Sequence, residues 1–67
     1  MAVSNTLKEI RTKRNICQEE LALAIGSCGR TISRIERGER NPSLELALRI
    51  SNYLGITVEE LFSIDDN

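Results

Sequence analysis

Residues 17–37 read CQEELALAIGSCGRTISRIER and carry the pattern that decides the fold. Apolar and small residues recur at helical spacing on both sides of Gly26, which predicts two helices joined by a short turn. Gly26 can adopt the positive φ that such a turn requires. Ala22 is small enough for the helices to approach closely, and Ile32 and Ile35 can fill the angle between them. The spacing therefore predicts two helices that cross at a large angle.

The second of these helices, expected over residues 28–37, has two opposite faces. At about 100° per residue, with Arg30 placed at zero, Arg34 lies at about 40°. Ile32 and Ile35 lie on the other side, at about 200° and 140°. Arginine suits contact with DNA because it forms two parallel hydrogen bonds to guanine or clamps a phosphate. An arginine stripe opposite a core stripe indicates a helix-turn-helix whose second helix enters a major groove.

The rest of the chain predicts an all-α fold of five helices, because polar breaks separate apolar patterns of helical spacing about every ten residues. Thr6 with Glu9, and Thr57 with Glu60, match the capping box that opens a helix. Pro42 suits the first turn of a helix. The predicted helices run from Ser4 or Thr6 to Arg14, Cys17 to Ile25, Cys28 to Arg37, Pro42 to Leu54 and Thr57 to Phe62.

Length and composition indicate one small soluble domain over residues 1–67, with 40% hydrophobic and 28% charged residues. The longest apolar run is Leu21–Ile25, whereas a membrane span needs about 20 residues. We see no signal-peptide pattern and expect a cytoplasmic protein without a membrane partner. The net charge is -1, but residues 1–40 carry eight basic and five acidic side chains, and residues 41–67 carry one and five. The basic half favours nucleic acid as its partner.

The two cysteines, Cys17 and Cys28, are too few to staple a secreted fold, and the chain has no histidine to complete a zinc site. We therefore expect reduced thiols, no metal and no cofactor. An enzyme is not expected, since a histidine base, a glycine-rich phosphate loop and a nucleophile elbow are all missing. Both thiols fall at predicted helix N-termini, where the helix dipole lowers a thiol pKa, so redox sensing is an additional hypothesis.

Three segments resemble the Cro and phage-repressor type of helix-turn-helix, also called XRE-like. They are Gln18–Ala22 followed by Gly26, Thr31–Gly38, and Asn41–Leu44. The resemblance covers about residues 6–63. It implies a five-helix lambda-repressor-like domain that regulates transcription, as a repressor or autoregulator. It also implies binding to a palindromic double-stranded DNA operator as a homodimer.

The resemblance assigns DNA contacts residue by residue. Base contacts would come from Cys28, Gly29, Arg30, Thr31 and Arg34. Phosphate contacts would come from Cys17, Gln18, Ser33, Arg37, Arg40 and Asn41. Gly29 departs from the family pattern because it has no side chain with which to contact a base. Glu39 also departs, because it places a negative charge where a phosphate favours a positive one.

Glu36 lies at about 240° on the second helix of the motif, between the arginine stripe and the core stripe. The family fold brings the first predicted helix beside it. We therefore predict a structural ion pair between Arg11 and Glu36 that orients the second helix.

The fourth predicted helix is apolar over an arc of about 220°, wider than the about 100–140° that one core face needs. The fifth helix can cover part of this excess. We predict that region 43–63 contributes both to the core and to a homodimer interface. The interface residues are Leu46, Tyr53, Ile56, Phe62 and Ile64. Such a dimer would place two recognition helices about 34 Å apart, on successive major grooves.

A protein-binding adaptor, or an antitoxin-like module with weak DNA affinity, is the alternative function. The net charge of -1, the glycine at position 29 and the acid at position 39 favour it. The acidic side chains of Glu19, Glu20 and Glu36 are candidates for contact with RNA polymerase. Salt dependence separates the two functions, because a DNA binder loses affinity steeply as salt rises.

Overall fold

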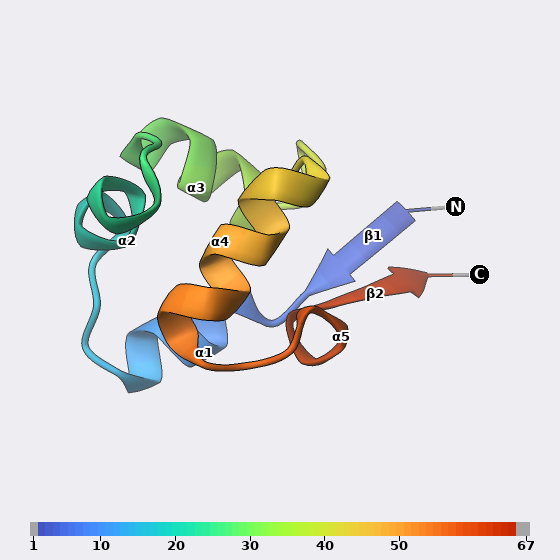
Figure 1. The fold of residues 1–67 in the computed structure, drawn as a ribbon. Helices are drawn as coiled ribbons and strands as arrows, with labels where there is room; N and C mark the ends of the chain where they lie inside the picture. Colours follow the sequence, from blue (N-terminus) through green and yellow to red (C-terminus); the bar gives the residue numbers. More distant parts are fainter. Residues whose placement is uncertain (1, 66–67) are drawn as a thin grey trace.

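The computed structural model describes residues 2–65, which form five helices and two short strands (Figure 1). The helices form the body of the molecule, and the strands extend from it as a two-stranded ribbon. Along the chain the elements are β1 (Ala2–Asn5), α1 (Leu7–Lys13), α2 (Gln18–Ile25), α3 (Gly29–Glu36), α4 (Leu44–Leu54), α5 (Val58–Leu61) and β2 (Phe62–Asp65). The five predicted helices are present, but the ribbon makes the fold mostly helical and not strictly all-α.

The ribbon pairs β1 with β2 in antiparallel register, with Val3 opposite Ile64 and Asn5 opposite Phe62. It is anchored to the helices at its inner end. The side chain of Asn5 donates a hydrogen bond to the carbonyl of Ile35 over 2.9 Å, and the amide of Thr6 donates to the carbonyl of Leu61 over 3.0 Å. The two strands therefore connect the start of α1 with the ends of α3 and α5.

The core is a single cluster to which every helix contributes. Its fully buried large side chains are Leu7, Leu21, Ile32, Ile35, Ile50 and Leu61. Ile10, Ile16, Leu46, Ile56 and Phe62 pack against this cluster and are partly buried. Since α3 gives both of its isoleucines to the core, its opposite face is left toward solvent.

Local signals fix the starts of α2 and α5 and the end of α2 as the sequence predicts. Cys17 accepts a hydrogen bond from the amide of Glu20 over 3.4 Å and so caps α2. At α5, Thr57 accepts from the amide of Glu60 over 3.2 Å and donates to its carboxylate over 3.1 Å. Gly26 ends α2 in the left-handed conformation, with φ 74°. These ends depend on residues within one turn, which explains why they could be predicted.

At the starts of α1 and α4, the predicted roles of Thr6 and Pro42 are wrong. Thr6 precedes α1 but its side chain forms no capping bond, and its hydroxyl donates to the carbonyl of Glu60. The side-chain oxygen of Asn5 takes its place and accepts from the amide of Leu7. Pro42 lies before the first turn of α4, since Ser43 is the capping residue. The fifth helix also ends one residue early, because Phe62 belongs to β2.

No helix in residues 2–65 is both long enough and apolar enough to cross a membrane.

Candidate nucleic-acid interface

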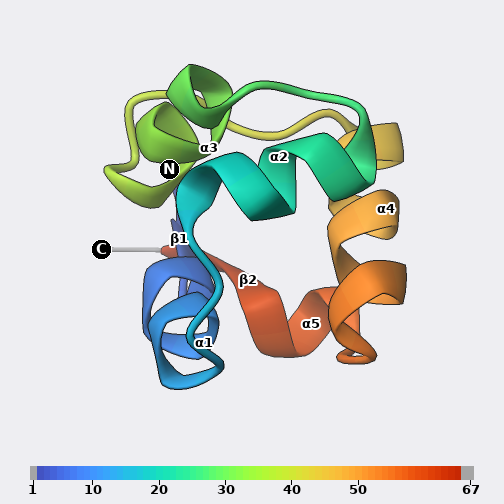
Figure 2. The same cartoon turned by 90° about the vertical axis from the view of Figure 1, so that its left-hand side faces the viewer.

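The α2 and α3 helices lie side by side in both views of the fold (Figures 1 and 2). Ala22 is 1% exposed and lets them approach closely, as its small size predicts. Ile32 and Ile35 are 0% and 1% exposed. Arg30 and Arg34, from the opposite face of α3, are exposed. The structure therefore presents the arginine stripe of α3 to solvent and uses its isoleucine stripe for packing.

A buried carboxylate holds α3 in this orientation. Glu36 has a side chain that is 2% exposed, and Arg11 donates to it from Nε over 2.7 Å and from Nη2 over 3.2 Å. Gln18 donates a third hydrogen bond to Glu36 over 3.0 Å. Arg11 also donates to the carbonyl of Ile16 over 2.8 Å. The structure thus brings the predicted partners together and adds Gln18, so that α1, α2 and α3 meet at one charge.

The pairing with Glu36 favours the protonated, charged form of Arg11. Its hydrogen bond to Glu36 raises the pKa of the guanidinium above the usual value, against an opposing contribution from burial. An unpaired buried carboxylate would destabilise the fold, and the permanently charged guanidinium of Arg11 keeps the carboxylate of Glu36 paired.

Gln18 is a predicted phosphate contact and also a hydrogen-bond donor to Glu36. One hydrogen of its side-chain amide goes to Glu36, so a phosphate contact must use the second hydrogen or the backbone amide. This half-buried residue is at the first position of α2. The same side chain can therefore connect a bound phosphate to the charge that fixes α3.

The remaining predicted phosphate-contacting residues lie at the cap of α2, within α3 and in the segment after α3. Arg40 and Asn41 are exposed, and Ser33 is half-buried. Arg37 pairs with Glu39 over 3.3 Å, with both side chains at least half exposed. Within residues 2–65, Arg30, Arg34 and Arg40 form no ion pair. Three guanidinium groups are therefore available to an anionic partner.

Gly29, the predicted base-contacting residue without a side chain, is buried. The reason is Glu19 of α2, whose carboxylate lies directly over it. A Cβ atom added to Gly29 would stand 2.0 Å from Oε1 and 2.6 Å from Cδ of Glu19. The sequence suggested Glu19 only as a candidate for contact with RNA polymerase. No local signal indicates the contact, because the two residues belong to different helices.

Both thiols are free and exposed at helix starts, as predicted for reduced cysteines. The pKa of Cys28 lies below its ordinary value, chiefly because the hydroxyl of Thr31, 3.4 Å from the sulfur, stabilises the thiolate. The amide of Thr31 adds to this effect, and the carboxylate of Glu19 opposes it. Cys28 does not cap α3 through its side chain. Redox sensing stays a hypothesis.

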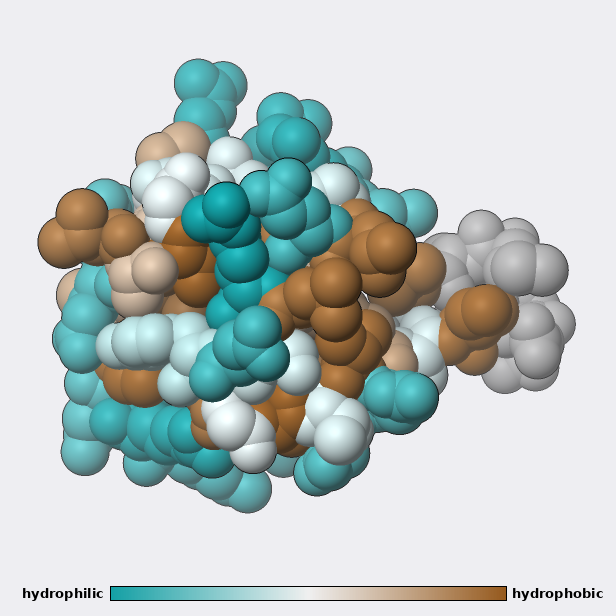
Figure 3. Space-filling view, viewed as in Figure 1, coloured by the Kyte–Doolittle hydropathy of each residue, from teal (hydrophilic) through white to brown (hydrophobic). Residues whose placement is uncertain are grey.

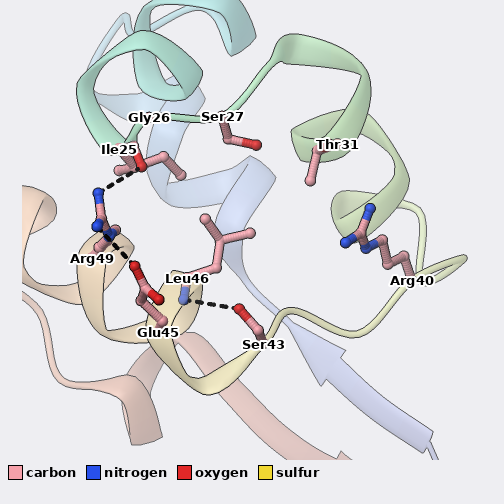
Figure 4. A pocket seen from close by; sticks show the side chains of 9 residues that line it. All are labelled: Ile25, Gly26, Ser27, Thr31, Arg40, Ser43, Glu45, Leu46 and Arg49. Carbon is pink, nitrogen blue, oxygen red and sulfur yellow. Dashed lines mark hydrogen bonds and ion pairs between the residues drawn. The ribbon is translucent and has the colours of Figure 1, made fainter.

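A hollow of about 320 Å³ lies between the turn after α2 and the start of α4 (Figure 4). Arg49 closes one side by pairing with Glu45 over 2.7 Å and donating to the carbonyl of Ile25 over 3.4 Å. Arg40 and Thr31 line the other side. No group of three or more metal-ligating side chains occurs in the described part of the chain.

The predicted dimer residues differ in exposure. Tyr53 is 45% exposed and Ile64 is 62% exposed, whereas Leu46, Ile56 and Phe62 pack partly against the core. Leu44 and Leu48 of α4 are also exposed, at 75% and 48%. Apolar surface lies between α4 and the ribbon in the space-filling view (Figure 3). The excess apolar width of α4 is thus only partly covered by the rest of the chain.

Comparison with known proteins gives consistent results. A family model described as helix-turn-helix matches residues 7–61. An HTH-type transcriptional regulator of Methanocaldococcus jannaschii is 38% identical over 65 residues, covering 97% of this chain and 98% of that protein. The transcriptional repressor RstR of a cryptic CTXphi phage, from Vibrio cholerae, is 32% identical over 90% of this chain and 54% of its own length. The crystal structure of the restriction-modification controller protein C.AhdI from Aeromonas hydrophila matches with a TM-score of 0.75 and 37% identity, over 81% of this chain and 82% of that one.

Proposed function

Since the chain belongs to the XRE-like helix-turn-helix family of DNA-binding transcriptional regulators, we propose that it is a sequence-specific repressor that binds a palindromic operator as a homodimer. The similarity to RstR, a transcriptional repressor, and to C.AhdI, a restriction-modification controller protein, supports this choice. A protein that occupies a promoter represses without any further contact, which is the simplest action for a small DNA-binding domain.

The observation that carries the proposal is the free arginine face of α3. Arg30 and Arg34 are exposed and form no ion pair within residues 2–65, while Ile32 and Ile35 on the other face are buried. An unpaired guanidinium can donate to O6 and N7 of guanine. We infer that these two arginines specify guanines in each half-site.

Phosphate contacts position the domain on DNA, and we assign them to both sides of α3. The exposed Arg40 and the Arg37 side chain follow α3, and the start of α2 with Gln18 precedes it. Backbone amides at a helix start and arginine side chains both bind phosphate oxygens. Since each neutralised phosphate contributes a slope of about -0.9 to the salt dependence, affinity should fall steeply with salt.

A homodimer supplies the specificity that one half-site lacks, because two linked half-sites multiply their selectivity. We propose that the dimer interface includes Tyr53 and Ile64, with Leu46, Ile56 and Phe62 contributing their remaining exposed surface. Self-association would cover the apolar surface beside α4 and leave the α3 arginines free.

Selection of binding sites from a random duplex library, with reduced protein at low and at moderate salt, tests the proposal. We expect a palindrome whose half-sites are about one helical turn apart and contain guanine. If no motif is enriched and binding disappears between the two salt concentrations, the protein has only nonspecific phosphate affinity. That result would favour the adaptor function over the repressor.

Sedimentation tests the dimer separately. Ile64→Asp should yield a monomer and a large loss of affinity for the palindrome, because a charge would enter an apolar interface. Leu23→Asp is the matched control, since Leu23 is 84% exposed on α2 and lies outside the proposed interface. A wild-type protein that stays monomeric at tens of micromolar contradicts the proposed homodimer.

A further inference from the structure

The contact between Glu19 and Gly29 joins the first turn of α2 to the first turn of α3. Gly29 does not have a positive φ, so its backbone does not require glycine. What it lacks is space, because Glu19 Oε1 lies 2.0 Å from where a Cβ would stand. The Glu19 side chain thus occupies the place from which a residue at position 29 would extend.

The Glu19 carboxylate is not engaged by the protein. Within the described chain it takes part in no ion pair and no side-chain hydrogen bond, although Glu9, Glu36, Glu39 and Glu45 all have partners. Glu19 is exposed, so its oxygens remain open to a ligand.

We propose that Glu19 is a specificity-determining residue that contacts a base in place of the side chain missing at position 29. This inference rests on the proposed binding of Arg30 and Arg34 in the major groove. With α3 in the groove, the carboxylate over Gly29 faces the base edges near the start of that helix. An acidic group close to DNA is repelled by phosphate unless a base donates to it, so its contribution depends on sequence.

The base is cytosine. A carboxylate only accepts hydrogen bonds, and the amino donor is the only hydrogen-bonding group that cytosine itself presents in the major groove. Guanine presents O6 and N7, and thymine presents O4, which would all repel the carboxylate. Adenine has an amino donor, but its N7 acceptor lies beside it. Glu19 therefore selects one base and disfavours the other three.

The test compares all four bases at each position of the selected half-site by competition binding. We expect the wild type to prefer cytosine at one position by about 5- to 100-fold, the usual range for a specific base contact. Glu19→Ala should lose this preference while keeping guanine selection at the other positions. Glu20→Ala is the matched control, because it removes the same charge from the next residue of α2 and should keep the preference.

Gly29→Ala provides a second test with Glu19 intact. The new Cβ must displace the carboxylate, which can move because it is the end of a flexible side chain. The variant should fold and should lose the cytosine preference as Glu19→Ala does. In Glu19→Ala/Gly29→Gln, a glutamine on α3 should shift the preference at this position to adenine.

Three outcomes would overturn the inference. Glu19→Ala could keep the wild-type base profile, could bind every site more tightly by the same factor, or could match Glu20→Ala. In each case Glu19 would either repel DNA regardless of its sequence or take no part in binding. These results differ from a failure of the proposed function, in which the wild type itself enriches no motif.

Discussion

The Arg11–Glu36 pair beneath α3 and the Arg49–Glu45 pair on α4 both have a shortest N–O distance of 2.7 Å, but their surroundings are opposite. The side chains of the first pair are 9% and 2% exposed, and those of the second are 54% and 74% exposed. Gln18 adds a third hydrogen bond to Glu36, whereas the Glu45 side chain is largely exposed to solvent. An equal distance therefore does not mean an equal contribution to stability.

Burial decides the difference between these two regions. A charge removed from water destabilises the fold unless its partners remain, so deleting one partner of a buried pair is costly. An exposed pair exchanges its interaction for water at little net cost. The region behind the arginine face is thus sensitive to single substitutions, and the outer side of α4 tolerates them.

Arg11→Ala should have the largest effect on this comparison. It leaves Glu36 buried with Gln18 as its remaining side-chain donor, so we expect a loss of about 3–5 kcal/mol in the free energy of unfolding. Urea denaturation measures it. Lys13→Ala, which breaks the exposed pair with Glu9, is the control and should change the midpoint little. If Arg11→Ala changes neither the stability nor the DNA affinity, the ion pair does not have the predicted structural role.

Arg34→Ala should reduce DNA affinity without reducing stability. Its side chain is exposed and unpaired within residues 2–65, so the unfolding midpoint should stay near that of the wild type. Affinity for the selected operator should fall by about 1–3 kcal/mol through loss of one base contact. Fluorescence anisotropy measures this, with Arg49→Ala as the control on α4. An equal loss in both variants would indicate only a general charge effect.

Substitutions of Cys17 test how much the cap at the start of α2 contributes to stability. Serine accepts a hydrogen bond better than a thiol, so Cys17→Ser should stabilise the protein by about 0.5–1 kcal/mol. Cys17→Ala loses the acceptor of the Glu20 amide and should be the least stable of the three. Thermal unfolding ranks them. A ranking with cysteine above serine would show that the capping bond at 3.4 Å is not what stabilises α2.

Glu45→Gln should have the smallest effect, less than about 0.5 kcal/mol, because both partners are exposed and only four residues apart on a helix. The difference from the wild type should shrink further at high salt. Urea denaturation at two salt concentrations is the measurement. A loss comparable to that of Arg11→Ala would mean that burial does not explain the contrast between the two pairs.

The sequence predicted what depends on neighbouring residues. The turn at Gly26, the cap at Thr57 and the two faces of α3 each require only a few adjacent positions, and the structure contains all three. The Arg11–Glu36 pairing was reached through the family resemblance, because the two residues are far apart in the chain.

The features that the sequence did not predict depend on tertiary contacts. The strands of the ribbon have four residues each, which is too short for a strong alternation signal, and each needs its partner from the other end of the chain. The Thr6 hydroxyl is taken by Glu60 of α5, and the Glu19 carboxylate covers Gly29 of α3. In each case a residue from another element outcompetes the local pattern.

The ribbon also affects how the molecule opens. Pairing β1 with β2 closes a loop that contains all five helices, and loop-closure entropy opposes such long-range pairing. An isolated two-stranded ribbon has little stability of its own, so this one forms only when the helices have brought its strands together. Its amides should therefore exchange with solvent faster than those of Ile32 and Ile50 in the core. Hydrogen exchange in the ribbon measures how often the two strands separate while the helices stay folded.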